Sequence, residues 1–339
     1  MAHERAIVVG AGGISGAWFP PLVAEKVQVV AVVDLAKDRA EKRIEEYKLA
    51  GTVAYDDLGK ALRKCKADFL VDLTVPEAHC GVTCAGLKAG LHVVSEKPMA
   101  SSMAEARRMV KTAEATGRLY MVSQSRRWDA KHETVAKTVL GGKLGTLTTM
   151  NCDFYIGAHF GGFRDAMPSP LILDMSIHHF DMARMMSGKD ALAVYCEEFN
   201  PKGSWYKGDV AANAVFEMTG GVRFAYRGSW CAEGCHTSWN GDWRMIGDRG
   251  TLIYDHDKDP VGEVLAGKKG FFRKLRPLAT VKSKLKFGGM HGALREMLAF
   301  LRTGRKPQTE CHDNIKSLAM VFAAIESAKS GKRVAVKAL

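Results

Sequence analysis

The sequence predicts an α/β protein of two domains, a doubly wound parallel sheet followed by a domain with mostly antiparallel strands. Three observations lead to this prediction. Residues 1–122 alternate β-rich runs with segments of helical spacing, whereas residues 123–339 contain longer strands in which apolar and polar residues alternate. The chain of 339 residues also exceeds the roughly 250–300 residues at which a single core stops growing.

Each strand expected in the first domain is a continuous apolar run bounded by turn residues, as is typical of a strand covered on both faces. The segments between these runs have the spacing of helices, so the order of elements indicates a parallel sheet with helical crossovers. The strands are expected at residues 5–10, 27–34, 68–74, 91–96 and 119–123, and the helices at residues 36–49, 76–90 and 102–117.

The second domain is expected to begin with a helix near residues 131–140 and to end with helices near residues 291–301 and 313–329. Several of the strands between them alternate in the manner of a sheet with one covered face. They are expected at residues 144–156, 191–200, 209–219, 221–230 and 242–255.

Composition places the chain among ordinary globular proteins, with 47% hydrophobic and 25% charged residues. The apolar run at residues 6–24 is nearly long enough for a targeting or membrane segment, but four glycines and the pair Pro20–Pro21 favour a strand, a turn and a short helix. We therefore expect no targeting segment, no membrane partner and a cytoplasmic location.

Cysteine and charge patterns suggest neither a metal site nor a nucleic-acid site. The eight cysteines are scattered, and the trio Cys231, Cys235 and His236 lacks both the usual CxxC spacing and a fourth ligand. The net charge is +12, and the basic segment at residues 268–286 carries eight Lys and Arg. It is expected to be a solvated loop, because no nucleic-acid motif accompanies it.

A glycine-rich turn, GAGGISG, follows the first strand directly. Gly10 and Gly12 occupy the first two positions of a dinucleotide-binding fingerprint, and Ser15 stands where that fingerprint has Gly or Ala. Glycines let the backbone approach a pyrophosphate, whose charge then meets the helix amides. We expect the turn, including Gly13 and Ile14, to bind the cofactor.

Asp34 ends the second strand, about 20 residues beyond the turn, where a carboxylate binds the ribose diol of a dinucleotide. The alternative is that Asp34 only caps the helix that starts near Lys37. Because its charge would repel a 2′-phosphate, NAD is expected rather than NADP.

A later apolar stretch, residues 168–186, is interrupted by Asp174, His178 and Asp181. At 3.6 residues per turn these three fall on one helix face, while His179 points elsewhere. Burying a carboxylate and an imidazole is costly without partners, so the face is either structurally paired or binds a substrate.

Three motifs together resemble the glucose-fructose oxidoreductase / inositol dehydrogenase / rhizopine catabolism (Gfo/Idh/MocA) family of nicotinamide-dependent sugar and polyol oxidoreductases. They are Thr74-Val75-Pro76 with His79, then Glu96-Lys97-Pro98, and the D-x-x-x-H-x-x-D spacing that starts at Asp174. The resemblance implies a Rossmann domain joined to an α/β domain with a large open, mostly antiparallel sheet. It also implies a homodimer or homotetramer.

The resemblance places the family's catalytic lysine at Lys97, its active-site aspartate at Asp174 and its acid/base histidine at His178. It also implies cofactor contacts at Thr74, Val75, Pro76, His79, Glu96 and Lys97. The chain departs from the family at Pro168-Ser169-Pro170, where members commonly have a run of glycines.

The same roles follow from the chemistry of alcohol oxidation, which removes a hydride from carbon and a proton from oxygen. Histidine is the natural general base near neutral pH, so His178 is expected to take the proton. Asp174 can orient the ring or bind a neighbouring hydroxyl, and the charge of Lys97 can stabilise the developing alkoxide. Asp181 is either structural support or a substrate contact.

Aromatic and basic side chains supply further candidates for substrate contacts. Rings beside amides and charges suit a carbohydrate, although sheet packing or an oligomer interface also favours them. The candidates are Trp230, Trp239, Asn240, Asp242, Trp243 and Arg244, together with Arg126, Arg127 and Trp128 after the last strand of the first domain.

The sequence therefore predicts an NAD-dependent oxidoreductase acting on a secondary alcohol of a small carbohydrate, glycoside or cyclic polyol. Two other classes share the same residues. One is an NAD-dependent glycosidase that oxidises its substrate transiently, and the other is a sensor that binds NAD and sugar without turnover. Net reduction of NAD would separate the dehydrogenase from both.

Overall fold

The computed structural model describes residues 4–339, which divide into two compact units. The first contains the chain up to Trp128 and then Phe287–Ile315, and the second contains Asp129–Lys286 and Lys316–Ala338. The boundary expected after residue 122 thus differs from the observed one, because a helix from the C-terminal third returns to the first unit.

The first unit contains a six-stranded parallel sheet in the order β3-β2-β1-β4-β5-β6. This strand order is that of a Rossmann domain. The strands are β1 (Arg5–Val9), β2 (Gln28–Val33), β3 (Val53–Tyr55), β4 (Phe69–Asp72), β5 (His92–Glu96) and β6 (Tyr120–Ser123).

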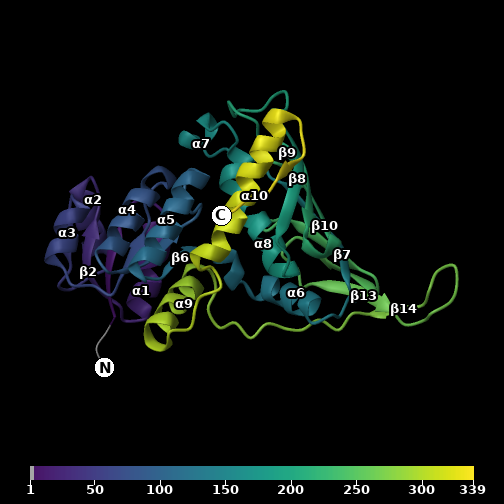
Figure 1. Ribbon diagram of the computed structural model, residues 1–339, viewed down its shortest axis with the longest axis horizontal. Helices are drawn as coiled ribbons and strands as arrows, with labels where there is room; N and C mark the ends of the chain where they lie inside the picture. Colours follow the sequence, from purple (N-terminus) through teal and green to yellow (C-terminus); the bar gives the residue numbers. More distant parts are fainter. Residues whose placement is uncertain (1–3) are drawn as a thin grey trace. The chain divides into compact units, whose positions relative to one another are not determined.

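Helices connect the successive strands of this sheet, further helical segments follow its last strand, and α4 packs against α5 (Figure 1). They are α1 (Ser15–Ala24), α2 (Lys37–Glu46), α3 (Leu58–Lys64), α4 (Pro76–Lys88), α5 (Met103–Thr116), the 3-10 turn η1 (Ser125–Trp128) and α9 (Gly289–Thr303). The sequence did not predict β3 or α3, because three and seven residues are too few for a clear period.

The second unit contains a nine-stranded sheet in the order β14-β13-β12-β11-β7-β10-β9-β8-β15. Within it β7 and β10 pair in parallel, and the other neighbouring strands pair antiparallel. The fold class predicted from the sequence is therefore confirmed. The strands are β7 (Leu147–Tyr155), β8 (Ala191–Phe199), β9 (Ala211–Met218), β10 (Arg223–Ser229), β11 (Asp242–Gly247), β12 (Gly250–Tyr254), β13 (Val261–Leu265), β14 (Leu275–Pro277) and β15 (Val334–Ala335).

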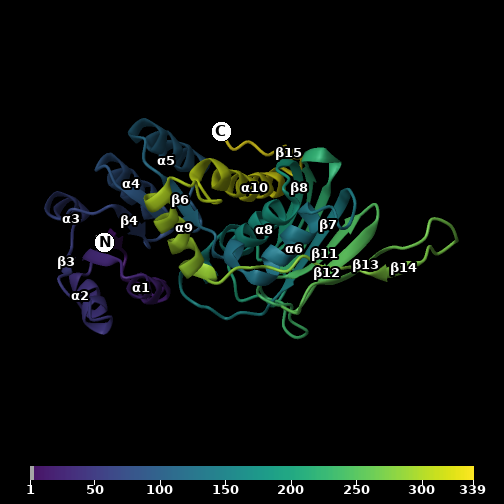
Figure 2. The same cartoon turned by 90° about the horizontal axis from the view of Figure 1, so that it is seen from below.

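Helices α6 and α8 pack together over one face of this sheet (Figure 2). The second unit's helical segments are α6 (Ala130–Leu140), α7 (Phe163–Ala166), the π-helical turn η2 (Leu171–Ser176), α8 (Ile177–Ser187) and the 3-10 turn η3 (Thr219–Gly221). Helix α10 (Cys311–Ser330) begins in the first unit and continues in the second. Among residues 4–339, no helix combines the length and apolar character needed to cross a bilayer.

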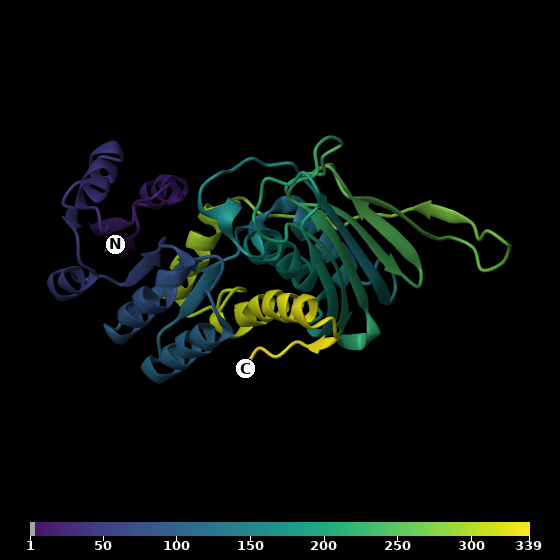
Figure 3. The ribbon, with the colours of Figure 1, turned by 90° about the horizontal axis from the view of Figure 1, so that it is seen from above.

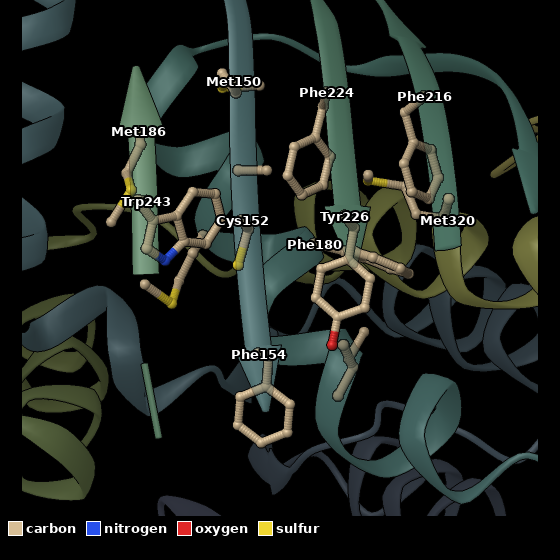
Figure 4. Close-up of a cluster of buried hydrophobic side chains, with 14 of the residues drawn as sticks. Met150, Cys152, Phe154, Phe180, Met186, Phe216, Phe224, Tyr226, Trp243 and Met320 are labelled. Atoms are coloured by element: carbon tan, nitrogen blue, oxygen red, sulfur yellow. The ribbon is translucent and has the colours of Figure 1, made fainter. Parts of the chain in front are cut away.

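The covered face of the nine-stranded sheet forms the core of the second unit (Figure 4). Phe216 and Phe224 stack on neighbouring strands with ring centroids 5.7 Å apart, and Phe180 of α8 meets Phe216 edge-on at 4.8 Å. Trp243 stacks on Phe224 at 5.8 Å. Because alternate residues of each strand point to this face, helix α8 is fixed against the sheet through its aromatic and methionine side chains.

The expected basic loop follows β13 as a long hairpin that extends from the sheet (Figure 3). Phe271 and Phe272 lie near its tip and are almost fully exposed, with the Lys and Arg side chains around them.

Glu198 of β8 is half-buried beside the loop at residues 168–170, and one of its carboxyl oxygens is inaccessible to solvent. Its Oε2 accepts a hydrogen bond from Ser169 Oγ at 3.2 Å, while its Oε1 is buried without a partner among residues 4–339. Burial raises the pKa of Glu198 to about 7; the Ser169 hydrogen bond opposes this shift and the charge of Asp209 adds to it.

The raised pKa predicts that Glu198 makes the protein less stable as pH rises. The folded state retains the proton above the ordinary pKa of 4.5, so the contribution is complete below that value and is lost as pH rises through about 7. At about 1.4 kcal/mol per pKa unit the loss is about 3 kcal/mol. We expect Glu198→Gln to raise the free energy of unfolding above about pH 8 but not near pH 5, measured by denaturant titration. Glu197→Gln, at the exposed neighbour, is the control; an equal response of both variants would contradict the prediction.

Candidate functional site

The glycine turn of the first unit contains glycines of two kinds. Gly10 has φ +98°, and a Cβ there would lie 2.6 Å from the carbonyl oxygen of Leu73, so the fold itself requires glycine. A Cβ at Gly12 or Gly13 would meet nothing within 4 Å. Packing within the protein therefore does not require glycine at positions 12 and 13. The close approach of a dinucleotide pyrophosphate to the backbone would require it.

Ser15 fits the turn because its hydroxyl forms a local hydrogen bond. The side chain is fully buried, and its Oγ donates to the Gly12 carbonyl at 2.6 Å. The serine thus replaces the expected Gly or Ala at the start of α1 without leaving a buried polar atom unsatisfied. Ile14, beside it, is 38% exposed.

Asp34 connects the end of β2 to the glycine turn. Its Oδ2 accepts from the Ala11 amide at 2.8 Å, and its Oδ1 accepts from the Ala36 amide at 3.0 Å. Ala36 is the N-cap residue of α2, and its own side chain forms no capping hydrogen bond. The alternative in which Asp34 only caps this helix is therefore wrong, because the carboxylate also binds the turn expected to hold the cofactor.

The loops after β4 and β5 are joined by His79. Its Nδ1 lies 2.9 Å from the Pro98 carbonyl oxygen and its Nε2 lies 3.0 Å from that of Thr74, and the ring is fully buried. The sequence analysis expected the His79 side chain to contact the cofactor. The structure corrects this, because the buried ring instead supports the two loops that it joins. The adjacent turn residues stay accessible, with Val75 60% exposed and Thr74 and Pro76 half-buried.

Glu96 likewise supports the loop that carries Lys97. It is 6% exposed, and its carboxylate accepts from Trp18 Nε1 at 2.8 Å and from the Lys97 amide at 3.2 Å. Burial raises the pKa of this carboxyl, and the Trp18 hydrogen bond opposes the shift. The expected cofactor contact of this side chain is corrected in the same way, because both oxygens face protein donors. Lys97 itself is half-buried directly after β5, at the carboxyl edge where open α/β sheets bind ligands.

Arg127 and Trp128 were expected to contact substrate, but both pack within the first unit. Arg127 is 6% exposed, donates to the Gln308 carbonyl at 2.9 Å and forms an ion pair with Asp313 at 2.8 Å. Trp128 is 3% exposed and packs so tightly on Gly292 of α9 that a Cβ there would lie 2.4 Å away. Their assignment to substrate is corrected to packing between η1 and the segment that returns to this unit.

In the second unit, the predicted polar face divides into an exposed and a buried part. Asp174 lies in the π-helical turn η2 with a side chain 12% exposed, and His178 is half-buried at the start of α8. Asp181 is 1% exposed and accepts from Ser317 Oγ at 2.6 Å, which makes it structural support. His179 points to the sheet, as expected, and packs fully buried on Phe154. Single π turns occur frequently at functional sites.

Arg164 is a further candidate, which sequence reasoning missed. Its Nε donates to Asp174 Oδ2 at 2.6 Å, and its guanidinium lies over the rings of Phe160 and Phe163. The residue lies in the short helix α7, directly after Gly161 and Gly162 and ten positions before its partner, and neither motif nor periodicity marks it. The one local feature of the sequence is that Phe163 and Arg164 follow two consecutive glycines, and this does not indicate a functional role.

The tryptophans expected to bind sugar lie in different surroundings. Trp243 is 1% exposed and stacks in the sheet core, so its assignment to substrate is corrected to core packing. Trp230 is 2% exposed and meets Phe160 edge-on at 5.0 Å, which also makes it a packing residue. Trp239, 44% exposed and 6.0 Å from Phe160, is the accessible ring of the three.

The sequence trio Cys231, Cys235 and His236 is not gathered into a metal-type cluster. Within residues 4–339, the potential metal ligands that come within range of one another are Glu310, Cys311 and His312. His312 already bridges two carboxylates there, at 2.6 Å from Glu310 and 2.9 Å from Glu114.

Comparison with known proteins agrees with this arrangement. Residues 5–124 match the GFO_IDH_MocA model, described as an oxidoreductase family with an NAD-binding Rossmann fold, and residues 132–253 match the GFO/IDH/MocA C-terminal domain. The chain belongs to the Gfo/Idh/MocA family. It is thus a member of an oxidoreductase family, and its first unit is an NAD-binding Rossmann domain.

Relatives in this family include an inositol 2-dehydrogenase of Streptomyces avermitilis, 30% identical over 63% of this chain and 62% of its own length. The D-apiose dehydrogenase of Paraburkholderia graminis is 24% identical over 92% of this chain and 84% of its own. The crystal structure of an Agrobacterium radiobacter oxidoreductase in complex with NAD+, L-tartaric acid and magnesium shares the fold, with a TM-score of 0.86, 19% identity and 99% of each chain covered.

The two kinds of glycine predict opposite effects of substitution. Gly10→Ala places a Cβ against the Leu73 carbonyl at positive φ and should cost about 2–4 kcal/mol of stability. Gly12→Ala adds a Cβ that meets no protein atom within 4 Å, so the melting temperature should stay near wild type; Gly12→Val, which adds more bulk at the same open position, should raise the NAD dissociation constant about tenfold or more. Thermal melts and NAD calorimetry measure both effects, and each variant controls for the other. A Gly12→Val protein with native NAD affinity would disprove the assignment.

Asp34 is expected to set the preference for NAD over NADP. Asp34→Ser removes the repulsion toward a 2′-phosphate, so the ratio of kcat/KM with NADP to that with NAD should rise about tenfold or more. Asp38→Ser, which removes the same charge from the exposed first turn of α2, is the control. A wild-type protein that already binds NADP more tightly than NAD would refute this role.

Proposed function

We propose that the protein transfers a hydride between a secondary alcohol of a sugar, glycoside or cyclic polyol and NAD. The observation that supports this most is the division of the polar face in the second unit. Asp174 in the π turn and His178 at the start of α8 keep partial exposure, whereas Asp181 and His179 are buried among protein partners. The relatives named as inositol and D-apiose dehydrogenases support the same class of alcohol.

The residues present suit NAD, because the open space beside Gly12 and Gly13 and the carboxylate of Asp34 match a pyrophosphate and a ribose diol. When bound, NAD supplies the acceptor for the hydride. In this proposal His178 takes the hydroxyl proton as general base, and Lys97 stabilises negative charge on the substrate oxygen. Asp174, held by Arg164, accepts a hydrogen bond from a substrate hydroxyl or orients the imidazole.

Turnover with NAD tests the function directly. Sugars, polyols and glycosides are incubated with the protein and NAD while nicotinamide absorbance and product identity are followed. A dehydrogenase reduces NAD in proportion to product, whereas a glycosidase that oxidises transiently gives product without net reduction, and a sensor gives neither. The homodimer or homotetramer and the cytoplasmic location stay predictions.

The general base makes the sharpest prediction. His178→Asn keeps similar volume but removes the proton acceptor, so kcat and kcat/KM should fall together by about 10²–10⁴-fold while NAD affinity and melting temperature persist. Lys97→Met should show a comparable defect, and the double variant should be much less than multiplicatively worse if both act in one step.

His179, although adjacent, is unsuitable as the control because its ring is part of the buried aromatic core. His256→Asn serves instead, since His256 is exposed and its φ of +48° is one that Asn tolerates. Near-native turnover by the His178 variant on a confirmed substrate would exclude His178 as the base.

A further inference from the structure

Arg164 is fixed in position without being fully covered. Its Nε donates to Asp174 Oδ2 at 2.6 Å, and its guanidinium carbon lies 5.0 and 4.7 Å from the ring centroids of Phe160 and Phe163. The side chain is nevertheless 32% exposed. Two rings and one carboxylate therefore orient the cation while part of it still faces outward.

Most of the hydrogen-bonding capacity of this guanidinium is unused. A guanidinium has five N–H donors, and within residues 4–339 only the Nε donor of Arg164 has a side-chain or backbone acceptor. Nη1 and Nη2 together form a planar fork that matches the two oxygens of a carboxylate. Because the aromatic rings displace water from the cation, a hydrogen bond to a ligand anion there is stronger than at an open surface.

The surroundings of Arg164 suit a sugar more than a simple anion. Phe160 and Trp239 are 43% and 44% exposed and lie 6.0 Å apart, so they offer apolar surface to the CH groups of a sugar. Asp174, bonded to the same arginine, offers a carboxylate to sugar hydroxyls. Anionic, apolar and hydroxyl groups on one ligand would thus each have a counterpart.

We propose that Arg164 binds a carboxylate of the substrate, which makes the substrate an acidic sugar or a polyol acid and not a neutral one. This inference rests on the proposed function and names the substrate class more narrowly. The competing explanation is that Arg164 only fixes Asp174 in position. In that case its loss would affect acidic and neutral ligands alike.

Direct binding tests the inference without requiring turnover. Calorimetry on the NAD-loaded protein compares D-glucuronate and D-galacturonate with their methyl esters, and D-gluconate with D-glucitol. At least one acid should bind about tenfold or more tightly than its neutral counterpart, since a charge-assisted hydrogen bond contributes about 1.5–3 kcal/mol. Arg164→Gln should abolish that difference, so that it weakens the binding of the acid about tenfold more than the binding of its neutral counterpart, which loses only the support that Arg164 gives to Asp174.

Two further variants complete the experiment. Arg164→Lys keeps the charge but not the fork, so it should retain part of the preference, and it replaces the Gln variant if that protein does not fold. Arg227→Gln is the matched control, because Arg227 is also paired to an aspartate, Asp153 at 2.6 Å, but at an exposed position of β10 with 61% of its side chain accessible. The control should bind acids as wild type does.

Equal affinity for acids and neutral counterparts, or no binding of any acid, overturns the inference. So does an equal loss of acidic and neutral binding in Arg164→Gln, which would leave Arg164 as a positioning residue for Asp174. The proposed function fails separately: neutral substrates that reduce NAD would retain the function while refuting the acidic class. An acid that binds through Arg164 yet never reduces NAD would support the acidic class of ligand and refute the proposed dehydrogenase function.

Discussion

The backbone of the glycine turn passes so close to the end of β4 that Gly10 cannot carry a side chain. The carboxyl edge of the parallel sheet depends on this approach, because it brings the turn after β1 against the loop that begins at Leu73. Asp34 then connects the end of β2 to the same turn through the Ala11 amide, and His79 joins the loops after β4 and β5. The ends of four adjacent strands are thereby linked by hydrogen bonds or direct contact, and Lys97 belongs to one of the linked loops.

Burial of polar groups behind this edge explains why its loops are well defined. Asp72, Glu96 and His79 are almost inaccessible, and each meets protein donors or acceptors: Thr83 and Thr74 for Asp72, Trp18 for Glu96, and two carbonyls for His79. A buried polar group without its partner costs far more than the hydrogen bond gains, so such a network permits few alternative loop conformations. Val75 and the open face of the glycine turn stay accessible, and these are the residues that we propose to contact the cofactor.

The second unit fixes its polar residues differently, by packing one helix against a sheet. Phe180 and His179 of α8 meet the aromatic rings of β7, β9 and β10, and Ser317 of α10 binds Asp181. The π turn before α8 places Asp174 outside this packed region, where Arg164 reaches it. The π turn and α8 thus carry both a buried face, with His179 and Asp181, and a partly exposed pair, Asp174 and His178. Packing against the aromatic core determines which of these polar residues are buried.

The sequence by itself determined the longer strands and helices, the fold class and the family, because hydrophobic period, glycine spacing and short motifs are local properties of the chain. The short elements β3, α3, β14 and β15 were not predicted, and residues 242–255, expected as one strand, form β11 and β12. The sequence also indicated Lys97, Asp174 and His178, whose motifs span a few residues each. Only the tertiary structure decided which of the expected substrate and cofactor contacts are buried. Segments distant in sequence cover Trp243, Trp128, Arg127 and the side chains of His79 and Glu96. Likewise only the fold brings Arg164 to Asp174, because a side-chain contact across an irregular loop leaves no period or motif in the sequence.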